Sequence, residues 1–171
     1  MRFHRAVVVL ALAVVSQGCA GCIGKEFTIS RTFNVHAEST DPLCSTDRQE
    51  INLGNDLNDV KGFISKVELR KIKVQVTNPK TRDDSVATKG NGTVFIASSA
   101  TEPGTELSTY GDVDIVAGSE RDIEINAATA ATLSTLALND PNTFFVESRG
   151  CSDANPAFYE FKVYLTLYAG F

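Results

Sequence analysis

The sequence predicts an all-β protein, an antiparallel β-sandwich of Greek-key or jelly-roll type with one short helix. About eight short runs alternate between apolar and polar residues and end in turn-forming residues. Only one segment has a helical pattern, whereas a parallel α/β sheet needs a helix after most strands. The chain is also rich in Thr, Val and Ile, which suit pleated surfaces.

The first strand is predicted over 27–37 (FTISRTFNVHA), where apolar residues alternate and Arg31 is the single polar break. The segment 38–50 (ESTDPLCSTDRQE) predicts a loop, because its Asp-Pro pair is a turn signal. The segment 51–64 (INLGNDLNDVKGFI) is ambiguous between a short strand and a helical turn.

A second clear strand is predicted over 65–78 (SKVELRKIKVQVTN). Its apolar residues change parity at Arg70-Lys71, which indicates a β-bulge that keeps both sets facing the core. A polar loop, 78–92, and a further strand, 93–99 (TVFIASS), follow. Two strands are then predicted over 113–117 (VDIVA) and 122–127 (DIEINA), after a turn in ATEPGTE.

The helix is predicted over 126–141 (NAATAATLSTLALNDP), because Asn126 can cap it and Asn139 with Pro141 can stop it. Its expected apolar stripe contains Ala130, Leu133 and either Leu136 or Ala137. Two final strands, TFFVESR and AFYEFKVYLTLYA, are expected on either side of the loop GCSDANP. In the last strand Tyr159, Phe161, Val163, Leu165 and Leu167 point to one side.

The N-terminus has the features of an export signal. Arg2 and Arg5 precede ten apolar residues, Ala6–Val15, a length that suits a signal core and is too short to span a bilayer. Small residues then lead to Cys19. We interpret 1–18 as the signal peptide, 19–26 as an acylated cysteine with a tether, and 27–171 as one β-sandwich domain.

The stretch VSQGC, Val15–Cys19, resembles the lipobox of bacterial lipoproteins. The resemblance implies that the Cys19 sulfur is diacylated, the chain is cut before Cys19, and the new amine is acylated. Ser16 departs from the Leu that the family prefers, and Cys22, preceded by Ala20-Gly21, is the alternative site. Ala20 is not the inner-membrane retention Asp, so the resemblance favours the outer membrane. A redox pair, half a metal site, or a plain buried segment are the other interpretations of C-x-x-C.

Charge restricts the partners. The signal holds two of the sixteen Lys and Arg residues and none of the twenty-one Asp and Glu, so the mature chain has a net charge of −7. This balance argues against nucleic-acid binding and against a polybasic membrane patch. The membrane contact is therefore expected to come from the lipid, since two acyl chains already anchor a protein stably.

Export also bears on the remaining cysteines, because thiols tend to pair in oxidising compartments. Cys44 follows the first predicted strand and Cys151 lies between the last two. First and last strands are often neighbours in a Greek-key sandwich, so we expect a Cys44–Cys151 disulfide, with unpaired thiols as the alternative.

No catalytic, metal or cofactor site is predicted. After cleavage His36 is the only His that could serve a Ser-His-Asp triad, and an exposed strand residue is the favoured interpretation. Asp112 and Asp114 share one parity and could bind calcium or act as paired carboxylates, but they also fit a solvated sheet face. Asn55–Asp59 (NDLND) lacks the spacing of a calcium loop.

Three further clusters each have a functional and a structural interpretation: a glycine-containing segment, a group of basic residues, and the tyrosines. Lys89–Thr93 (KGNGT) fits a hairpin turn better than a phosphate loop, because a strand and not a helix follows. The basic concentration favours an edge-protecting or solubilising face over an anion site. Tyrosines could stack on sugars or pack as a second face. The basic residues are Lys66, Arg70, Lys71 and Lys73, and the tyrosines are Tyr110, Tyr159, Tyr164 and Tyr168.

From sequence alone we therefore expect a lipid-anchored envelope protein with a non-enzymatic binding or structural role. Its protein or glycan partner is not specified by any motif. A carbohydrate- or calcium-binding module is the first alternative, and a hydrolase is the second. No cofactor is expected for the favoured role.

Overall fold

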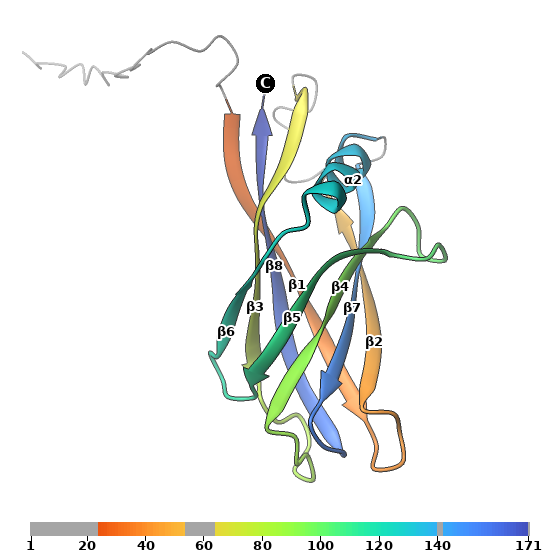
Figure 1. Ribbon diagram of the computed structural model, residues 1–171, viewed down its shortest axis with the longest axis vertical. Coiled ribbons are helices and arrows are strands. Elements are labelled where there is room, and N and C mark those ends of the chain that lie inside the picture. The colour runs from red at the N-terminus through yellow and green to blue at the C-terminus, as the bar shows by residue number, and fades with distance from the viewer. Residues whose placement is uncertain (1–23, 54–63, 140–141, 171) are drawn as a thin grey trace, which may run out of the picture.

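The computed structural model describes residues 24–53, 64–139 and 142–170. In this part of the chain, eight strands form two antiparallel four-stranded sheets, and one helix lies at one end of them (Figure 1). One sheet has the order β1-β8-β3-β6 and the other β2-β7-β4-β5. This strand order is that of a jelly roll, which confirms the predicted fold class. The elements are β1 (Gly24–Ala37), β2 (Cys44–Asn52), β3 (Lys66–Asn78), β4 (Lys89–Ala97), β5 (Thr105–Asp114), β6 (Glu120–Ile123), α2 (Ala127–Leu138), β7 (Thr143–Ser152) and β8 (Ala157–Gly170).

The core lies between the sheets and is built from alternate residues of the strands. The predicted inward set of β8, Tyr159 to Leu167, is at most 3% exposed throughout. Phe33 of β1 stacks on Phe161 of β8, with ring centroids 5.7 Å apart. Burial of these large side chains supplies most of the driving force for folding.

The first and last strands pair along their whole length, from Gly24↔Gly170 to Ala37↔Ala157. This neighbour relationship was expected, but the tether boundary was wrong. Residues 24–26 belong to β1, because β8 continues to Gly170 and offers them backbone partners. The predicted bulge in β3 is confirmed by a register shift between Leu69 and Lys71.

Other predicted boundaries were also wrong. The loop predicted over 38–50 contains most of β2, a strand with a single buried aliphatic, Ile51, that is held by pairing with β7. The strand predicted over 113–117 is the end of β5 and a turn, in which Gly118 has φ 86°. Strand β6 ends at Ile123, earlier than predicted. These strands are set by pairing with distant partners, which local alternation does not report.

The open sides of the sandwich are closed by side chains that bond to backbone. On one side, Arg31 Nε donates to Glu50 O at 2.9 Å, which accounts for the polar break in β1. On the other, Arg121 Nη1 donates to Asp112 O at 2.9 Å, and the Ser108 hydroxyl donates to Glu124 O. Satisfied edge groups make these edge strands poor templates for aggregation.

The helix α2 begins and ends as predicted. Asn126 accepts from Ala128 N at 3.0 Å as the N-cap, and Asn139 is the C-cap. Leu133 and Ala137 are buried, as expected, together with Thr129, whereas Ala130 of the predicted stripe is half-buried. Among the described residues, no helix combines the length and apolar character that crossing a membrane requires.

Candidate functional site: the loop end

Four loops meet at the end of the sandwich opposite the start of β1 (Figure 1). They are 38–43, 79–88, 115–119 and 153–156, and we call this region the loop end. Loops at one end of a rigid sandwich are common binding sites, because a scaffold positions them while their sequences vary freely.

Backbone hydrogen bonds join these loops in a row. Ser152 N donates to Leu43 O at 2.9 Å, and Val86 N donates to Pro156 O at 2.9 Å. Ile115 N donates to Thr88 O at 2.8 Å. The loop 38–43 is thus bonded to the end of β7, next to the loop 153–156. The loop 153–156 is bonded to the loop 79–88, which in turn is bonded to the loop 115–119. The loop end is therefore a preorganised surface and not four independent loops.

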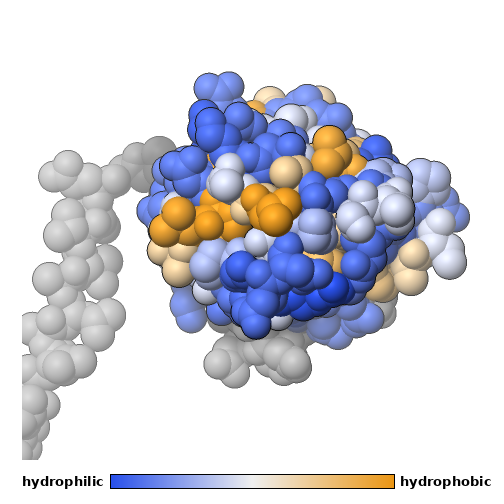
Figure 2. All heavy atoms as spheres, turned by 90° about the horizontal axis from the view of Figure 1, so that it is seen from below, coloured by the Kyte–Doolittle hydropathy of each residue, from blue (hydrophilic) through white to orange (hydrophobic). Residues whose placement is uncertain are grey.

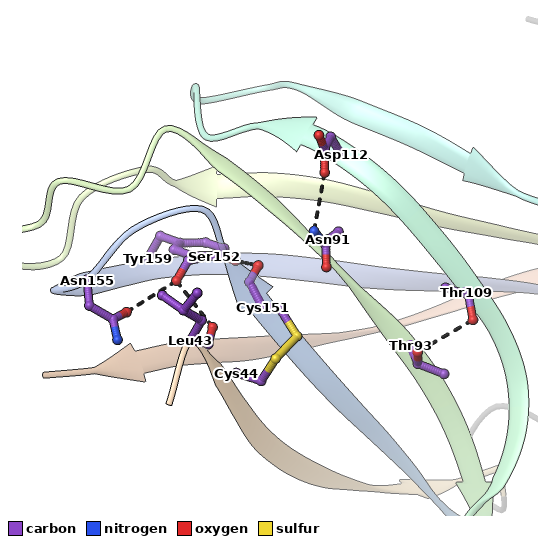
Figure 3. The surroundings of a disulfide bond; sticks show 10 residues. All are labelled: Leu43, Cys44, Asn91, Thr93, Thr109, Asp112, Cys151, Ser152, Asn155 and Tyr159. Carbon is purple, nitrogen blue, oxygen red and sulfur yellow. Dashed lines mark hydrogen bonds between the residues drawn. A yellow bond between two sulfur atoms is a disulfide. The ribbon is translucent and has the colours of Figure 1, made fainter. Parts of the chain in front are cut away.

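The disulfide Cys44–Cys151 lies at the root of this surface (Figure 3). Its Cα atoms are 3.9 Å apart, and its two cysteines are a direct cross-strand pair of β2 and β7. The predicted pairing is therefore confirmed, although both cysteines lie in strands and not in loops. Next to it, the Ser152 hydroxyl donates to Leu43 O at 3.2 Å, and the Tyr159 hydroxyl donates to Cys151 O at 3.2 Å (Figure 3).

Asp153 ties two of the loops together. It accepts from the Thr88 N–H at 2.9 Å, from the Thr88 hydroxyl at 2.6 Å and from the Lys89 N–H at 3.1 Å. Burial alone would raise the pKa of Asp153, but these hydrogen bonds outweigh it and lower the pKa. The carboxylate is thus charged and fixed at neutral pH.

Aliphatic side chains are exposed on this otherwise polar surface. Leu43, Val86 and Val116 come from three different loops and are 47%, 53% and 60% exposed. Figure 2, a view onto this end, shows apolar surface in several places among hydrophilic residues. The four loops hold five acidic and two basic residues, a net charge of −3. The surface combines apolar contact area with negative charge, a composition that suits a basic-rimmed partner.

His36 lies beside the loop end and not in a catalytic arrangement. Its side chain is 65% exposed, with Nε2 3.6 Å from Glu38 Oε1 and its ring edge-on to Phe158. The Arg82 guanidinium covers the Phe158 ring, 3.8 Å from its centroid, and donates to Glu38 Oε1 at 2.6 Å. These contacts fold the loop 79–88 over the sheet and are structural.

The acidic pair Asp112 and Asp114 is exposed on β5, as a solvated face would be. Asp112 accepts from Asn91 Nδ2 at 3.2 Å (Figure 3). Across residues 24–53, 64–139 and 142–170, no three His, Cys, Asp or Glu side chains are grouped to hold a metal ion. The predicted candidates Cys19, Cys22 and Asn55–Asp59 lie outside the described residues.

The structure places the basic residues and two of the tyrosines on one outer face. Lys73 sits 5.0 Å over the Tyr164 ring, and Arg70 sits 5.1 Å over the Tyr168 ring. A stacked sugar would compete with these cations for the ring faces. Strand β6 pairs with β3 only from Ile72 to Gln75, so Lys73 lies inside the sheet, whereas Lys66, Arg70 and Lys71 precede that pairing. The cations pair with neighbouring acids: Lys66 and Arg70 with Glu68, Lys71 with Asp122, and Lys73 with Glu120.

Lys89–Thr93, predicted as a hairpin turn, is part of strand β4. Its glycines serve close packing: a Cβ on Gly92 would collide with Arg149 O and Tyr110, and one on Gly90 with the Tyr159 hydroxyl. Tyr110 and Tyr159 are both buried, so their rings are not accessible for stacking on a sugar. Burial raises the pKa of Tyr110 to about 12 and also raises the pKa of Tyr159.

Sequence reasoning did not single out Leu43, Val86 or Val116. The available signal was weak: each is an aliphatic residue within a polar, turn-rich segment. Isolated exposed aliphatics are ordinary. Only the fold brings these three to one end.

Comparisons with known proteins indicate no family. No protein-family model matches the chain, and no curated protein matches it. Among solved structures it is similar to a decameric BFDV capsid protein, with 12% identity, a TM-score of 0.45 and coverage of 86% of this chain and 98% of that one. It is also similar to Desmodium yellow mottle tymovirus, with 14% identity, a TM-score of 0.32 and coverage of 99% and 93%. A third is turnip yellow mosaic virus, with 12% identity, a TM-score of 0.30 and coverage of 97% and 89%. The jelly-roll assignment rests on the strand order of this chain and not on these similarities.

Proposed function

We propose that this protein is a lipid-anchored component of the bacterial envelope, held at the outer membrane, with a non-enzymatic binding role. The observation that carries the proposal is the N-terminal pattern: a charged start, the apolar core Ala6–Val15, and Cys19 after a small residue. Strand β1 begins at Gly24, only five residues after Cys19. The anchor and the folded body are therefore almost directly joined.

The loop end is the binding face in this proposal. It lies at the far end of the sandwich from Gly24, so a short tether at Gly24 leaves it accessible (Figure 1). Its hydrogen-bonded loops lose little conformational entropy on binding, which favours affinity. Leu43, Val86 and Val116 supply the apolar contacts.

The alternatives receive less support from the geometry. A hydrolase would need a nucleophile positioned by His36, whose nearest partners are Glu38 and Phe158. A glycan site on the tyrosines would need Arg70 and Lys73 to leave the rings. We therefore favour binding of a protein partner.

The anchor is tested by metabolic labelling with an alkyne-bearing palmitate analogue in a Gram-negative host. We expect wild type and Cys22→Ser to be labelled, and Cys19→Ser to lose the label. Labelling that persists in Cys19→Ser, with a mature N-terminus at Cys22, would move the site by three residues. An unlabelled wild-type chain that remains in the soluble fraction would overturn the proposed function.

A further inference from the structure

The helix α2 has an unusual composition for a helix at a protein surface. Its sequence, AATAATLSTLAL, contains no charged residue. A surface helix normally carries an apolar stripe on one side and charged residues on the other. Here only Thr129, Leu133 and Ala137 are buried, so the uncharged composition extends onto the exposed side.

A second, uncharged stripe runs along the side of α2 that faces the start of β3. Ala127, Ala130, Ala131, Ser134 and Leu138 recur at the spacing of one helix face. Ala127, Ala131 and Leu138 are exposed, and Ala130 and Ser134 are half-buried. They form one wall of a groove of about 570 Å³, and the start of β3, residues 65–70, forms the other. Leu138 is 40% exposed. This volume lies in the range of sites that hold small apolar ligands, yet the groove is open to the outside.

The helix α2 and the start of β3, which line the groove, lie at the same end of the sandwich as the start of β1 (Figure 1). Gly24 and Lys66 both pair with Gly170, one on each side. Two strand spacings separate them, about 10 Å. Five residues from Gly24 to Cys19 span at most about 18 Å. A lipid on Cys19 would therefore hold this end of the molecule close to the bilayer surface.

Side chains typical of membrane interfaces line the groove, namely Lys66 and Arg70, or lie next to its lining, as Tyr168 does. Tyr168 lies against Gly24, so that a Cβ on Gly24 would collide with its ring, and Arg70 covers that ring at 5.1 Å. Tyr, Arg and Lys are enriched where proteins meet lipid headgroups. Lys66 and Arg70 share one acid, Glu68, which leaves the groove rim with a net charge of +1.

We propose that the uncharged stripe of α2 and the rim of its groove dock on the bilayer to which Cys19 anchors the chain. The proposal rests on the proposed lipid anchor and adds the orientation of the body. The uncharged stripe lies in the interface, Lys66 and Arg70 face lipid phosphates, and the loop end points away from the membrane. A short tether makes this contact intramolecular, so even a weak intrinsic affinity suffices.

Tryptophan fluorescence tests the orientation, because the chain has no Trp of its own. Mature lipoprotein carrying Leu138→Trp or Val116→Trp is reconstituted into phosphatidylcholine–phosphatidylglycerol vesicles that contain brominated lipids. An interfacial helix lies about 5–10 Å into the headgroup boundary, so shallow bromines should quench the emission of the Leu138→Trp protein. Its emission should also shift to the blue, because the indole enters a less polar environment. The Val116→Trp protein, a matched reporter at the loop end, should keep its emission.

Charge variants test the role of the stripe, and mass spectrometry of each preparation establishes whether the chain is acylated. Ala131→Glu, on the stripe, should abolish the quenching of the Leu138→Trp reporter, whereas Thr132→Glu, one residue away on the same helix, should not. Circular dichroism checks that both remain folded. Acylated protein whose Leu138→Trp reporter stays unquenched would overturn the docking alone. Leu138→Trp emission that is protected from the aqueous quencher iodide, in protein that sediments as a dimer, would overturn the docking on the bilayer and indicate that a second copy of the chain covers the groove. An unacylated mature chain would overturn both the docking and the anchor.

Discussion

Cys44 and Cys151 are separated by 107 residues in sequence and face each other directly across neighbouring strands. The bond joins the edge strand β2 to β7 where the loop 38–43 ends and the loop 153–156 begins. It therefore closes a long chain loop and at the same time fixes two of the four loops of the loop end.

Removal of this bond should be costly. For a closed loop of about 100 residues, loss of a disulfide lowers the free energy of unfolding by about 2–5 kcal/mol. We expect Cys44→Ala/Cys151→Ala and reduced wild type to unfold at lower denaturant than oxidised wild type. The Cys22→Ser protein is the control and should behave as wild type. Identical denaturation midpoints with and without reductant would contradict the prediction.

The glycines of β4 provide a test of packing. Gly92→Ala would place a methyl group against Arg149 O and Tyr110, so we expect a loss of about 1–3 kcal/mol of unfolding free energy. Gly111→Ala meets no atom within 4 Å and should change stability by about 0.5 kcal/mol or less. Urea denaturation measures both. Equal effects at the two positions would show that Gly92 is not sterically required.

Asp153 should make the stability of the loop end depend on acid. Its pKa is lower in the folded protein than its ordinary value of 3.8, so its contribution is present above that pH and is lost as pH falls through the folded pKa. Asp153→Asn should be less stable than wild type at neutral pH, and the difference should shrink below about pH 4. Asp83→Asn, at an exposed position of the same end, should match wild type. A constant difference across pH would refute the linkage.

Arg48 and Glu147 should form the most sensitive ion pair. Arg48 Nε donates to Glu147 at 2.9 Å, and Nη1 donates to Ala100 O and Glu102 O at 2.7 and 2.9 Å. Glu147 is only 8% exposed, so Arg48→Gln should cost about 3–5 kcal/mol by leaving a buried charge unpaired. Lys71→Gln, from an exposed pair with Asp122, should cost about 0–1 kcal/mol. Thermal denaturation distinguishes these cases, and similar costs would argue against burial as the cause.

The binding role of the loop end can be tested in cells. A photoreactive benzoyl-phenylalanine at Val86 or Val116 should give a discrete crosslinked product in the envelope. The same group at Lys162, on the outer face of β8, should not. Product formation should fall when Leu43→Asp is added, because charge disrupts the apolar contact. Equal crosslinking at all three positions would mean that the loop end is not a specific surface.

Elements whose pattern is local could be predicted from the amino-acid sequence. Alternating apolar residues located β1, β3 and β8, the change of parity at Arg70-Lys71 located the bulge, and Asn126 and Asn139 located the ends of α2. These signals are readable because each depends on residues within a few positions of one another.

The remaining features depend on contacts between residues that are far apart in sequence. Strand β2 has mostly polar side chains and exists because β7 pairs with it, and Gly90 and Gly92 resemble a turn but accommodate buried tyrosines. Likewise, Leu43, Val86 and Val116 are three unrelated aliphatics until the jelly roll brings their loops to one end. Pairing and packing between residues far apart in sequence leave no local periodicity, so only the folded chain reveals them.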